Sequence, residues 1–332
     1  MTAENRRIRW GVLGCARIAR ENVIPAILRS ANSELYAVAS REASKLADCR
    51  ARFPGAKTCH GYEELLRDPA VDAVYIPLPN ALHCEWTLKA AEHGRHVLCE
   101  KPLALTAAEG GRMIAACAAH GVLLMEAFMY RYTDRTRQVL EVLRSGALGD
   151  LKFIGSTFRF LLSNPASIKL QPALGGGALY DVGCYAVNFT GLVVDEILRS
   201  QSRPAADSLP EAVSTQWERA GGVDLQVSAL LKYPGGLIAA LHAGFNAQKR
   251  VFAEIIGTRG ALEIPDTFFN DAGALTLTTG DIRREIPVAA SDRYRLEVED
   301  FADAILHHRA PHLAPAETRR NLEVMDRIIA AG

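Results

Sequence analysis

The stretch GVLGCARIA, residues 11–19, decides the fold of the first part of the chain. Apolar residues lead into Gly14 and helix-forming residues follow, which is the pattern of a buried strand, a tight turn and the start of a helix. The spacing matches the dinucleotide fingerprint Gly-x-Gly-x-x-Gly, with Ala16 and Ala19 in the second and third glycine positions. Such a turn directs the N–H groups at the helix start toward phosphate oxygens. From this motif alone, a tight strand–helix turn without a ligand is the alternative.

The first 125 residues continue to alternate strand and helix patterns. The strands are almost purely apolar, as expected for a parallel sheet covered by helices on both faces. The sequence therefore predicts a doubly wound, Rossmann-type α/β domain over residues 1–125 that binds a dinucleotide. Its strands are expected at 9–13, 35–40, 71–77, 96–99 and 122–127.

The pattern changes after about residue 130. Residues 211–290 alternate apolar and polar side chains between glycine turns, which predicts antiparallel strands with one face in water. We therefore expect residues 126–332 to form an α+β domain, built on a large and mainly antiparallel open sheet. A long strand is expected at 151–162, and helices at 136–145, from the turn 175–177 to about 193, at 295–308 and at 316–330.

Composition excludes several classes of function. Lys plus Arg and Asp plus Glu number 38 each, without long blocks of one sign, so no nucleic-acid or anionic-membrane surface is expected. The apolar runs are too short for a membrane span, and the first ten residues do not resemble a secretion signal. The seven cysteines are scattered, without CxxC or zinc-ligand spacing. This predicts reduced thiols, no metal site and a cytoplasmic protein.

The end of the second strand indicates which cofactor is bound. Rossmann domains that prefer NAD place an acidic residue there, which binds the ribose 2′-hydroxyl. Here the strand ends with Ser40 and Arg41, and the acidic Glu34 lies at the opposite end of the strand. A hydroxyl and a guanidinium suit a 2′-phosphate, so we expect NADP in preference to NAD. A solvated loop arginine is the alternative interpretation.

Lys101 follows the strand at 96–99, at the edge where ligands bind in open α/β sheets. It lies between Glu100 and Pro102, and Asn80 follows the preceding strand at the same edge. Pro102 fixes the backbone and makes the Lys101–Pro102 bond a candidate for the cis form. We therefore expect a site residue at Lys101 and a structural partner of the turn at Glu100. An exposed loop lysine is the alternative.

A second polar group lies on the helix that follows the turn Gly175–Gly177. Asp181 and Tyr185 are four residues apart, so they share one helix face. They interrupt an otherwise apolar helix, which indicates a face directed at a ligand or at the other domain. A polar pair on the helix surface is the alternative.

Six motifs, in this order and spacing, carry a family resemblance. They are GVLGCARIA (11–19), the strand end Ser40-Arg41, IPLPNALH (76–83), HVLCEKPL (96–103), LMEAF (124–128) and GGGALYDVGCY (175–185). Together they resemble the glucose–fructose oxidoreductase/inositol dehydrogenase (Gfo/Idh/MocA) family. The chain is most similar to the branch with dihydrodiol dehydrogenases and NADP-dependent D-xylose dehydrogenases. The resemblance spans nearly the whole chain, and its departure from the family pattern is Ala16 in the phosphate turn.

The resemblance implies the roles of individual residues. The catalytic residues would be Lys101, Asp181 and Tyr185, and a tyrosine where many relatives have histidine places the chain in the tyrosine subset. A substrate pocket walled by Tyr130, Arg131 and Phe160 is expected, with ordinary domain-interface packing as the alternative. The expected cofactor-binding residues are Gly14, Cys15, Ala16, Arg17, Ile18, Ser40, Arg41, Lys45, Pro77, Leu78, Asn80, His83, Glu100 and Lys101.

These residues suggest a mechanistic hypothesis. Hydride passes between nicotinamide C4 and a carbinol or carbonyl carbon of a sugar, polyol or cyclic diol. A free tyrosine, with a pKa near 10, is a poor base at neutral pH, and a nearby ammonium favours its ionised form. Tyr185 would therefore be the general acid and base, Lys101 would assist it and hold the substrate oxygen, and Asp181 would orient a neighbouring hydroxyl.

Two other functions are compatible with the same sequence. One is a reductase of a nucleotide-linked keto-sugar, and the other is a non-catalytic regulatory protein that binds NADP. In each case the expected partner is a small molecule, without nucleic acid or membrane. Family precedent adds a homodimer or homotetramer formed through the C-terminal sheet.

Overall fold

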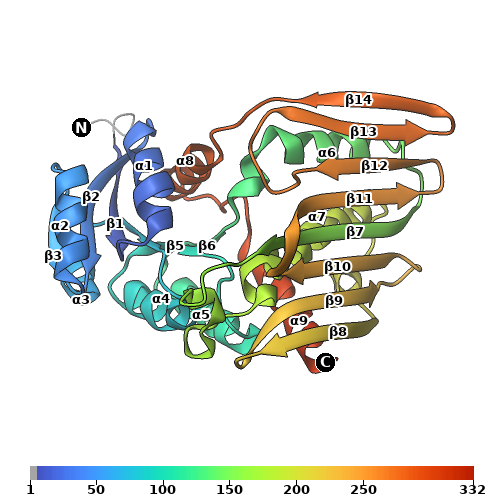
Figure 1. The fold of residues 1–332 in the computed structure, drawn as a ribbon. Helices are drawn as coiled ribbons and strands as arrows, with labels where there is room; N and C mark the ends of the chain where they lie inside the picture. The colour runs from blue at the N-terminus through green and yellow to red at the C-terminus, as the bar shows by residue number, and fades with distance from the viewer. Residues whose placement is uncertain (1–5) are drawn as a thin grey trace. The chain divides into compact units, whose positions relative to one another are not determined.

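The computed structural model describes residues 6–332, whose contacts divide the chain into two units (Figure 1). The first unit comprises the chain up to Met129 together with Arg293–Thr318. The second comprises Tyr130–Asp292 together with Arg319–Gly332. The boundary expected between residues 125 and 126 lies close to the first junction. The segment 293–318, which the sequence assigned to the second domain, packs with the first unit.

A parallel sheet with the strand order β3-β2-β1-β4-β5-β6 forms the centre of the first unit. Every neighbouring pair is parallel, which confirms the predicted doubly wound fold. The sequence did not predict β3, a short edge strand in which only one of four residues is buried. The six strands found within residues 6–332 are β1 (Ile8–Leu13), β2 (Ser33–Ser40), β3 (Lys57–His60), β4 (Ala73–Ile76), β5 (His96–Glu100) and β6 (Leu124–Ala127).

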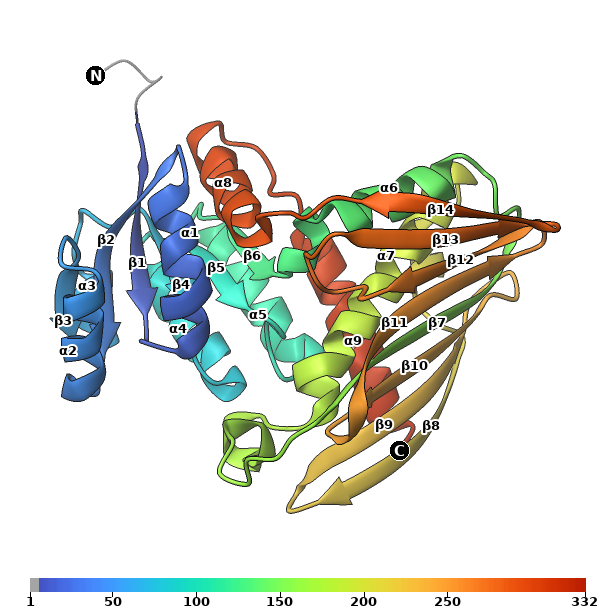
Figure 2. The same ribbon diagram turned by 45° about the horizontal axis from the view of Figure 1, so that its top comes forward.

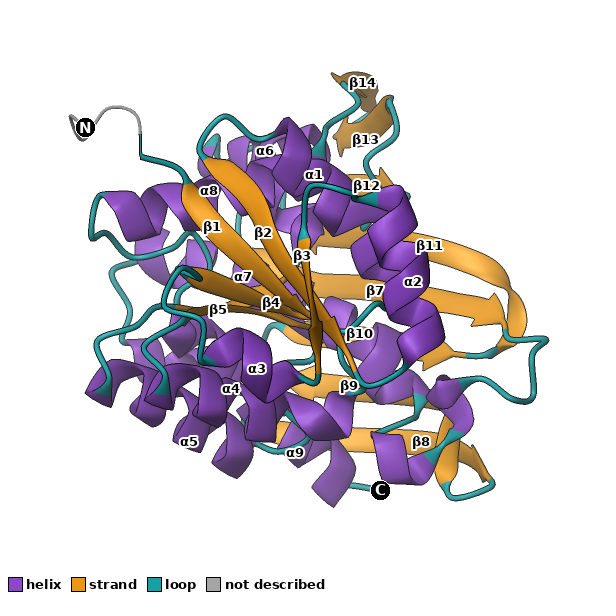
Figure 3. Cartoon of the chain, turned by 90° about the vertical axis from the view of Figure 1, so that its left-hand side faces the viewer, coloured by secondary structure: helices purple, strands orange, loops and turns teal. Residues whose placement is uncertain are grey.

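Helices cover both faces of this sheet (Figure 3). The helix after β1 contains a π-helical turn, η2, before it continues as α1. At the start of α5, the Thr106 hydroxyl accepts a hydrogen bond from the Glu109 N–H (3.1 Å), as in an N-cap. The helices are η2 (Ala19–Val23), α1 (Ile24–Arg29), α2 (Ala43–Arg52), α3 (Tyr62–Leu66), η3 (Asn80–Leu82), α4 (His83–Glu92), α5 (Ala107–Ala119) and α8 (Arg293–Leu306).

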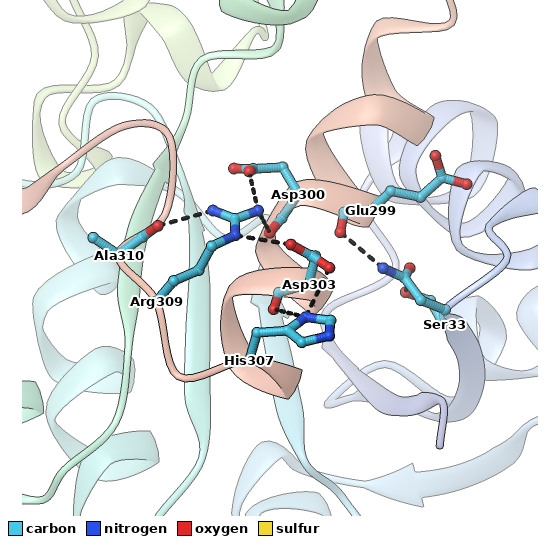
Figure 4. Close-up of polar contacts among 8 residues, drawn as sticks. Ser33, Glu299, Asp300, Asp303, His307, Arg309 and Ala310 are labelled. Atoms are coloured by element: carbon cyan, nitrogen blue, oxygen red, sulfur yellow. Dashed lines mark hydrogen bonds and ion pairs between the residues drawn. The ribbon is translucent and has the colours of Figure 1, made fainter. Parts of the chain in front are cut away.

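Helix α8 packs with the first unit because its apolar side meets the core under β1. Phe301 is fully buried, and its ring centroid lies 5.9 Å from that of Trp10 on β1. The Asn32 amide donates to the Glu299 carbonyl (2.9 Å), which joins α8 to the residue before β2. Beyond α8, the Arg309 guanidinium binds the carboxylates of Asp300 and Asp303 and so fixes the chain where it leaves the helix (Figure 4).

The second unit contains a sheet with the order β14-β13-β12-β11-β7-β10-β9-β8. All neighbours are antiparallel except β7 and β10, which confirms the predicted large, mainly antiparallel sheet. The eight strands, all within the described residues, are β7 (Leu151–Leu161), β8 (Ala212–Ala220), β9 (Val223–Lys232), β10 (Ile238–Gly244), β11 (Asn246–Gly257), β12 (Gly260–Pro265), β13 (Gly273–Thr279) and β14 (Ile282–Val288).

One face of this sheet is covered by helices (Figure 2). They are α6 (Asp134–Arg144), η7 (Leu179–Gly183) with α7 (Cys184–Ser200), and the second-unit part of α9 (Pro315–Ala330). The helical stretch Pro172–Ser200 is long and apolar enough to cross a membrane, but 89% of its most apolar window is buried inside the protein. This degree of burial is typical of a core helix.

Replacing Phe301 by alanine tests the assignment of α8. Loss of a fully buried phenylalanine against Trp10 should lower the free energy of unfolding by about 3–5 kcal/mol, measured by urea denaturation followed by tryptophan fluorescence. The matched control is Leu296→Ala, because Leu296 lies on the same helix and is 37% exposed. Equal destabilisation by the two substitutions would contradict the burial of Phe301 against Trp10.

Candidate active site

The turn after β1 has the geometry of a phosphate-binding turn. Gly14 has a φ of +115°, and a Cβ on it would lie 3.0 Å from Leu78 Cδ2, so a larger residue would be strained there. The Gly14 N–H donates to the Ala39 carbonyl (2.8 Å), which fixes the turn against β2. Ala16 has no positive φ, so this departure from the fingerprint fits the backbone. The helix that follows begins at Arg17 and Ile18, and its first N–H groups are available to an anion.

The end of β2 carries the residues expected to select the cofactor. Ser40 is buried, and its hydroxyl accepts from the Glu42 N–H (3.1 Å), which leaves the hydroxyl hydrogen as a donor. Arg41 is exposed, with its guanidinium carbon 5.5 Å from the centroid of the Tyr62 ring. Lys45 pairs with Glu42 (2.7 Å). These groups fit a phosphate on the ribose, and Tyr62 adds an aromatic surface that the sequence argument did not identify.

His83 joins two loops at the ligand edge of the sheet. Its ring is fully buried, with Nδ1 2.9 Å from the Pro102 carbonyl oxygen and Nε2 2.8 Å from the Leu78 carbonyl oxygen. Burial lowers the pKa of His83, against the effect of the two carbonyls. The other expected residues of this loop, Pro77 and Asn80, lie between β4 and α4 on the same loop as Leu78. His83 thus holds the Leu78 loop against the turn that contains Pro102.

The turn that carries Lys101 is flanked by two carboxyl groups that form hydrogen bonds, the half-buried Glu100 and the buried Glu126. The Lys101–Pro102 peptide bond is cis, which confirms the sequence prediction. The Tyr75 hydroxyl donates to Glu100 (2.6 Å), and the Leu103 N–H donates to Glu126 Oε1 (2.8 Å). Lys101 therefore projects from a turn whose backbone is fixed before and after it.

Glu126 is a buried acid whose pKa is raised above the ordinary value. Burial raises its pKa to about 7, the neighbouring Glu100 adds to the rise, and the Leu103 N–H and Lys101 oppose it. Glu297 on α8 is buried close to the same place, and burial together with Glu100 raises its pKa well above the ordinary value. Glu126 and Glu297, two buried acids near Glu100, are therefore both driven toward the neutral form by folding.

In the second unit, the glycine-rich turn before η7 lets other parts of the chain approach its backbone closely. A Cβ on Gly176 would lie 2.6 Å from the Lys169 carbonyl oxygen, and one on Gly177 would lie 2.2 Å from Asp224 Oδ1. The Asp224 carboxylate on β9 accepts from the Leu179 N–H (2.7 Å) at the start of the helix. Burial raises the pKa of Asp224. The glycines thus let a strand carboxylate cap the helix that carries Asp181.

Tyr185 lies in an aromatic environment on this helix. Its side chain is 5% exposed, and its ring centroid lies 5.2 Å from that of Phe268, 5.5 Å from Phe158 and 6.0 Å from Tyr130. The Tyr130 hydroxyl donates to Asn188 Oδ1 (2.5 Å), one helical turn beyond Tyr185. Tyr130, expected as a pocket wall, is therefore a direct neighbour of Tyr185.

Asp181 has a partner that the sequence argument missed. Lys169 Nζ forms an ion pair with Asp181 Oδ2 and lies 5.3 Å from the centroid of the Phe160 ring. Phe160 also packs on Phe245, with centroids 5.3 Å apart. Arg131, the third residue expected at the pocket, is buried in the 3-10 turn η4 (Met129–Tyr132). Within the second unit, the structure brings Asp181, Lys169 and Phe160 together, and it places Tyr185 next to Tyr130.

The residues that sequence reasoning missed share one property. Tyr62, Glu126, Lys169, Asn188 and Asp224 act through partners distant in the chain, so local spacing does not reveal them. Glu126 lies within the motif LMEAF, where an acid inside an apolar strand was an available signal. Among the described residues, no cluster of three or more His, Cys, Asp or Glu side chains suits a metal ion.

The substitution Glu126→Gln tests the neutral state of this acid. Between the ordinary carboxyl pKa of 4.5 and about 7, the folded protein retains a proton that the unfolded chain releases. The stability contributed by Glu126 therefore falls as pH rises through this window, whereas a glutamine does not titrate. From pH 5 to 8, the free energy of unfolding of the variant relative to the wild type should rise by up to about 3 kcal/mol.

Urea denaturation at each pH measures this difference. Glu92→Gln on α4 is the control, because Glu92 is exposed. A difference between wild type and Glu126→Gln that stays constant from pH 5 to 8 would show that Glu126 is ionised throughout.

Comparisons with known proteins agree with this architecture. A model described as the oxidoreductase family, NAD-binding Rossmann fold, matches residues 8–128, and the GFO/IDH/MocA C-terminal domain model matches residues 136–263. A D-xylose 1-dehydrogenase (NADP(+)) of Haloferax volcanii is 37% identical over 96% of this chain and 95% of its own length. A trans-1,2-dihydrobenzene-1,2-diol dehydrogenase of Xenopus tropicalis is 31% identical over 79% of this chain and 76% of its own length.

Solved structures of other oxidoreductases also match this chain over nearly its full length. A 3-ketoreductase from Actinomadura kijaniata, in complex with NADP and TDP-benzene, superposes with a TM-score of 0.88 and 30% identity over 98% of both chains. An aldose-aldose oxidoreductase from Caulobacter crescentus, complexed with glycerol, has a TM-score of 0.87 and 25% identity over 98% of this chain and 97% of its own. The matches to both domains and the identity over nearly the full length show that this chain belongs to the GFO/IDH/MocA oxidoreductase family.

Proposed function

We propose that this protein is an NADP-dependent oxidoreductase acting on a CH–OH group of a sugar, polyol or cyclic diol. The observation that carries the proposal is the position of Lys101. It lies at the carboxyl end of β5, in a sheet whose first turn has phosphate-binding geometry, and its turn is fixed by Glu100 and Glu126. Ligands in open α/β sheets bind at this edge. The named activities of the D-xylose, dihydrodiol and ketoreductase relatives support the same reaction class.

The proposed roles follow from the chemistry of each side chain. NADP would supply or accept the hydride, held by the turn Gly14–Ile18, by Ser40, Arg41 and Lys45, and by the loop of Pro77, Leu78 and Asn80. Tyr185 is the general acid and base for the substrate oxygen, since a tyrosine hydroxyl can donate and accept a proton and that of Tyr130 in the same cluster is bonded to Asn188. Lys101 assists by favouring the ionised tyrosine and by donating to that oxygen. Asp181 orients a neighbouring hydroxyl.

A reductase of a nucleotide-linked keto-sugar is the second candidate. Relatives named dTDP-3,4-didehydro-2,6-dideoxy-alpha-D-glucose 3-reductase, such as that of Actinomadura kijaniata (31% identical over 97% of this chain), favour it. Assays of NADP(H) turnover with pyranoses, dihydrodiols and a nucleotide-linked keto-sugar distinguish the candidates. Tight NADPH binding without turnover of any of these would instead support a regulatory protein.

We also propose that the protein is a cytoplasmic homodimer or homotetramer that associates through the open face of the second unit's sheet. Leu230 on β9 and Ile256 on β11 are 53% and 36% exposed. The strand register places both on the same face, since Leu230 aligns with Gly155 of β7 and Ile256 with Phe153. All seven cysteines are free and buried, which supports a reducing compartment.

Replacing Tyr185 by phenylalanine tests the catalytic assignment. Loss of the proton donor should lower kcat by about two to four powers of ten, while NADPH binding measured by fluorescence titration is retained. Tyr180→Phe on the same helix is the control and should retain at least a third of the wild-type kcat. Near-full activity of Tyr185→Phe would refute the role of this hydroxyl.

Replacing Arg41 by alanine tests the choice of cofactor. Loss of a charge-assisted contact to the 2′-phosphate should raise the KM for NADP about ten- to a hundredfold and leave the KM for NAD within twofold. Arg52→Ala is the control, because Arg52 lies on α2 and pairs with Asp48. A wild-type protein that prefers NAD, or an equal loss for both cofactors, would overturn the assignment.

A further inference from the structure

Lys169 is fixed by the backbone in a way that is unusual for a loop lysine. It lies in the 3-10 turn η5 (Ile168–Leu170), between β7 and the glycine-rich turn. Its carbonyl oxygen accepts from the Gly177 N–H (2.9 Å), and the Gln171 carbonyl accepts from the Gly176 N–H (3.0 Å). A Cβ on Gly176 would lie 2.6 Å from the Lys169 carbonyl oxygen. The absence of a side chain at Gly176 therefore permits the contact that holds Lys169 beside the start of the helix.

The Lys169 side chain has two defined neighbours. Its ammonium pairs with Asp181 and lies 5.3 Å from the centroid of the Phe160 ring, within the range of a cation–π contact. The Lys169 side chain is 37% exposed and that of Asp181 17%, so solvent reaches both. An ammonium has three N–H donors and a carboxylate has several acceptor positions, so the mutual contact does not exhaust either group. The pair thus presents a donor and an acceptor side by side.

We propose that Lys169 and Asp181 together recognise two neighbouring hydroxyl groups of the substrate. Asp181 accepts a hydrogen bond from one hydroxyl, and Lys169 donates to the oxygen of the next. Lys169 is then a residue that determines specificity for an uncharged vicinal diol, as found in sugars and polyols. This inference rests on the proposed oxidoreductase function and deepens it by naming the part of the substrate that is recognised.

Charge favours a diol over an anionic group at this position. The positive charge of Lys169 is compensated by Asp181, so a phosphate or carboxylate bound at the ammonium would face a carboxylate next to it. Like charges placed together in this way weaken binding. Hydroxyl groups can both donate and accept, so they satisfy the two members of the pair without adding charge.

The experiment combines a change in the protein with a change in the substrate. Initial rates are measured for wild type and Lys169→Met with NADP and D-xylose or its 2-, 3- and 4-deoxy analogues. Methionine keeps the length of the side chain and removes its charge and donors. For D-xylose, the substitution should raise KM about ten- to a hundredfold with kcat within a few fold, as expected for lost ground-state binding.

The decisive result is non-additivity at one hydroxyl position. For one deoxy analogue, the wild type should already show the raised KM, and Lys169→Met should add less than a twofold further change. Effects of the substitution and the hydroxyl deletion that multiply at every position would overturn the proposal. Lys169→Arg should recover part of the lost affinity, because it restores a cation with donors.

A control and an activity-independent measurement separate this inference from the proposed function. Lys232→Met is the matched control, because Lys232 forms an exposed pair with Glu211 (3.8 Å) in the same unit, and it should leave KM unchanged. If the wild type turns over no sugar, polyol or cyclic diol with NADP(H), the proposed function fails. Calorimetric titration of D-xylose and the deoxy analogues into the NADP-loaded proteins then still measures the coupling between Lys169 and one hydroxyl. If calorimetry shows no such coupling, the inference is overturned.

A further measurement tests the alternative anionic ligand. Pyrophosphate is titrated as an inhibitor competing with D-xylose for the wild type and for Lys169→Met. Equal weak inhibition of both proteins agrees with a pair that recognises hydroxyls. Inhibition of the wild type that is relieved at least tenfold by Lys169→Met would show that the ammonium binds an anion, and the diol proposal would fall.

Discussion

The requirement that buried polar groups find partners shapes the turn at Lys101. The side chains of Tyr75, His83 and Glu126 are buried in the first unit, and each is directed at the segment from Glu100 to Leu103. Leaving any of them without a partner would cost free energy, so the turn is stabilised in one conformation by groups outside it. A single lysine at a sheet edge is thus supported by residues from two strands and a helix, and it acquires a defined position.

Much of the fold was predictable because its signals are local. The apolar runs at β1, β4, β5 and β6 predicted a doubly wound sheet, and the alternating pattern after residue 211 predicted antiparallel strands. The edge strand β3 (Lys57–His60) was missed because only Cys59 in it is buried. The attachment of α8 was missed for a different reason, since an amphipathic helix shows that it has a buried face but does not show which core that face contacts.

The residues of the candidate site also differ in whether a local sequence signal marks them. Lys101 and the pair Asp181 and Tyr185 stand out because a proline or a helical spacing marks them in the sequence. The partners of these residues carry no such mark. Lys169 precedes Asp181 by twelve residues in an irregular segment, and Asp224 reaches the helix from another strand, so both contacts follow only from the folded backbone.

The position of α8 has a consequence for the order in which the protein is made. Trp10 and Asn32 leave the ribosome well before their partners Phe301 and Glu299, because all the strands of the second sheet lie between them in the chain. The first unit therefore cannot complete its core during synthesis of its own sheet, and must wait while the whole second sheet is translated. A chain that is cut short before residue 293 would expose apolar surface beside β1, where cellular quality control can recognise it.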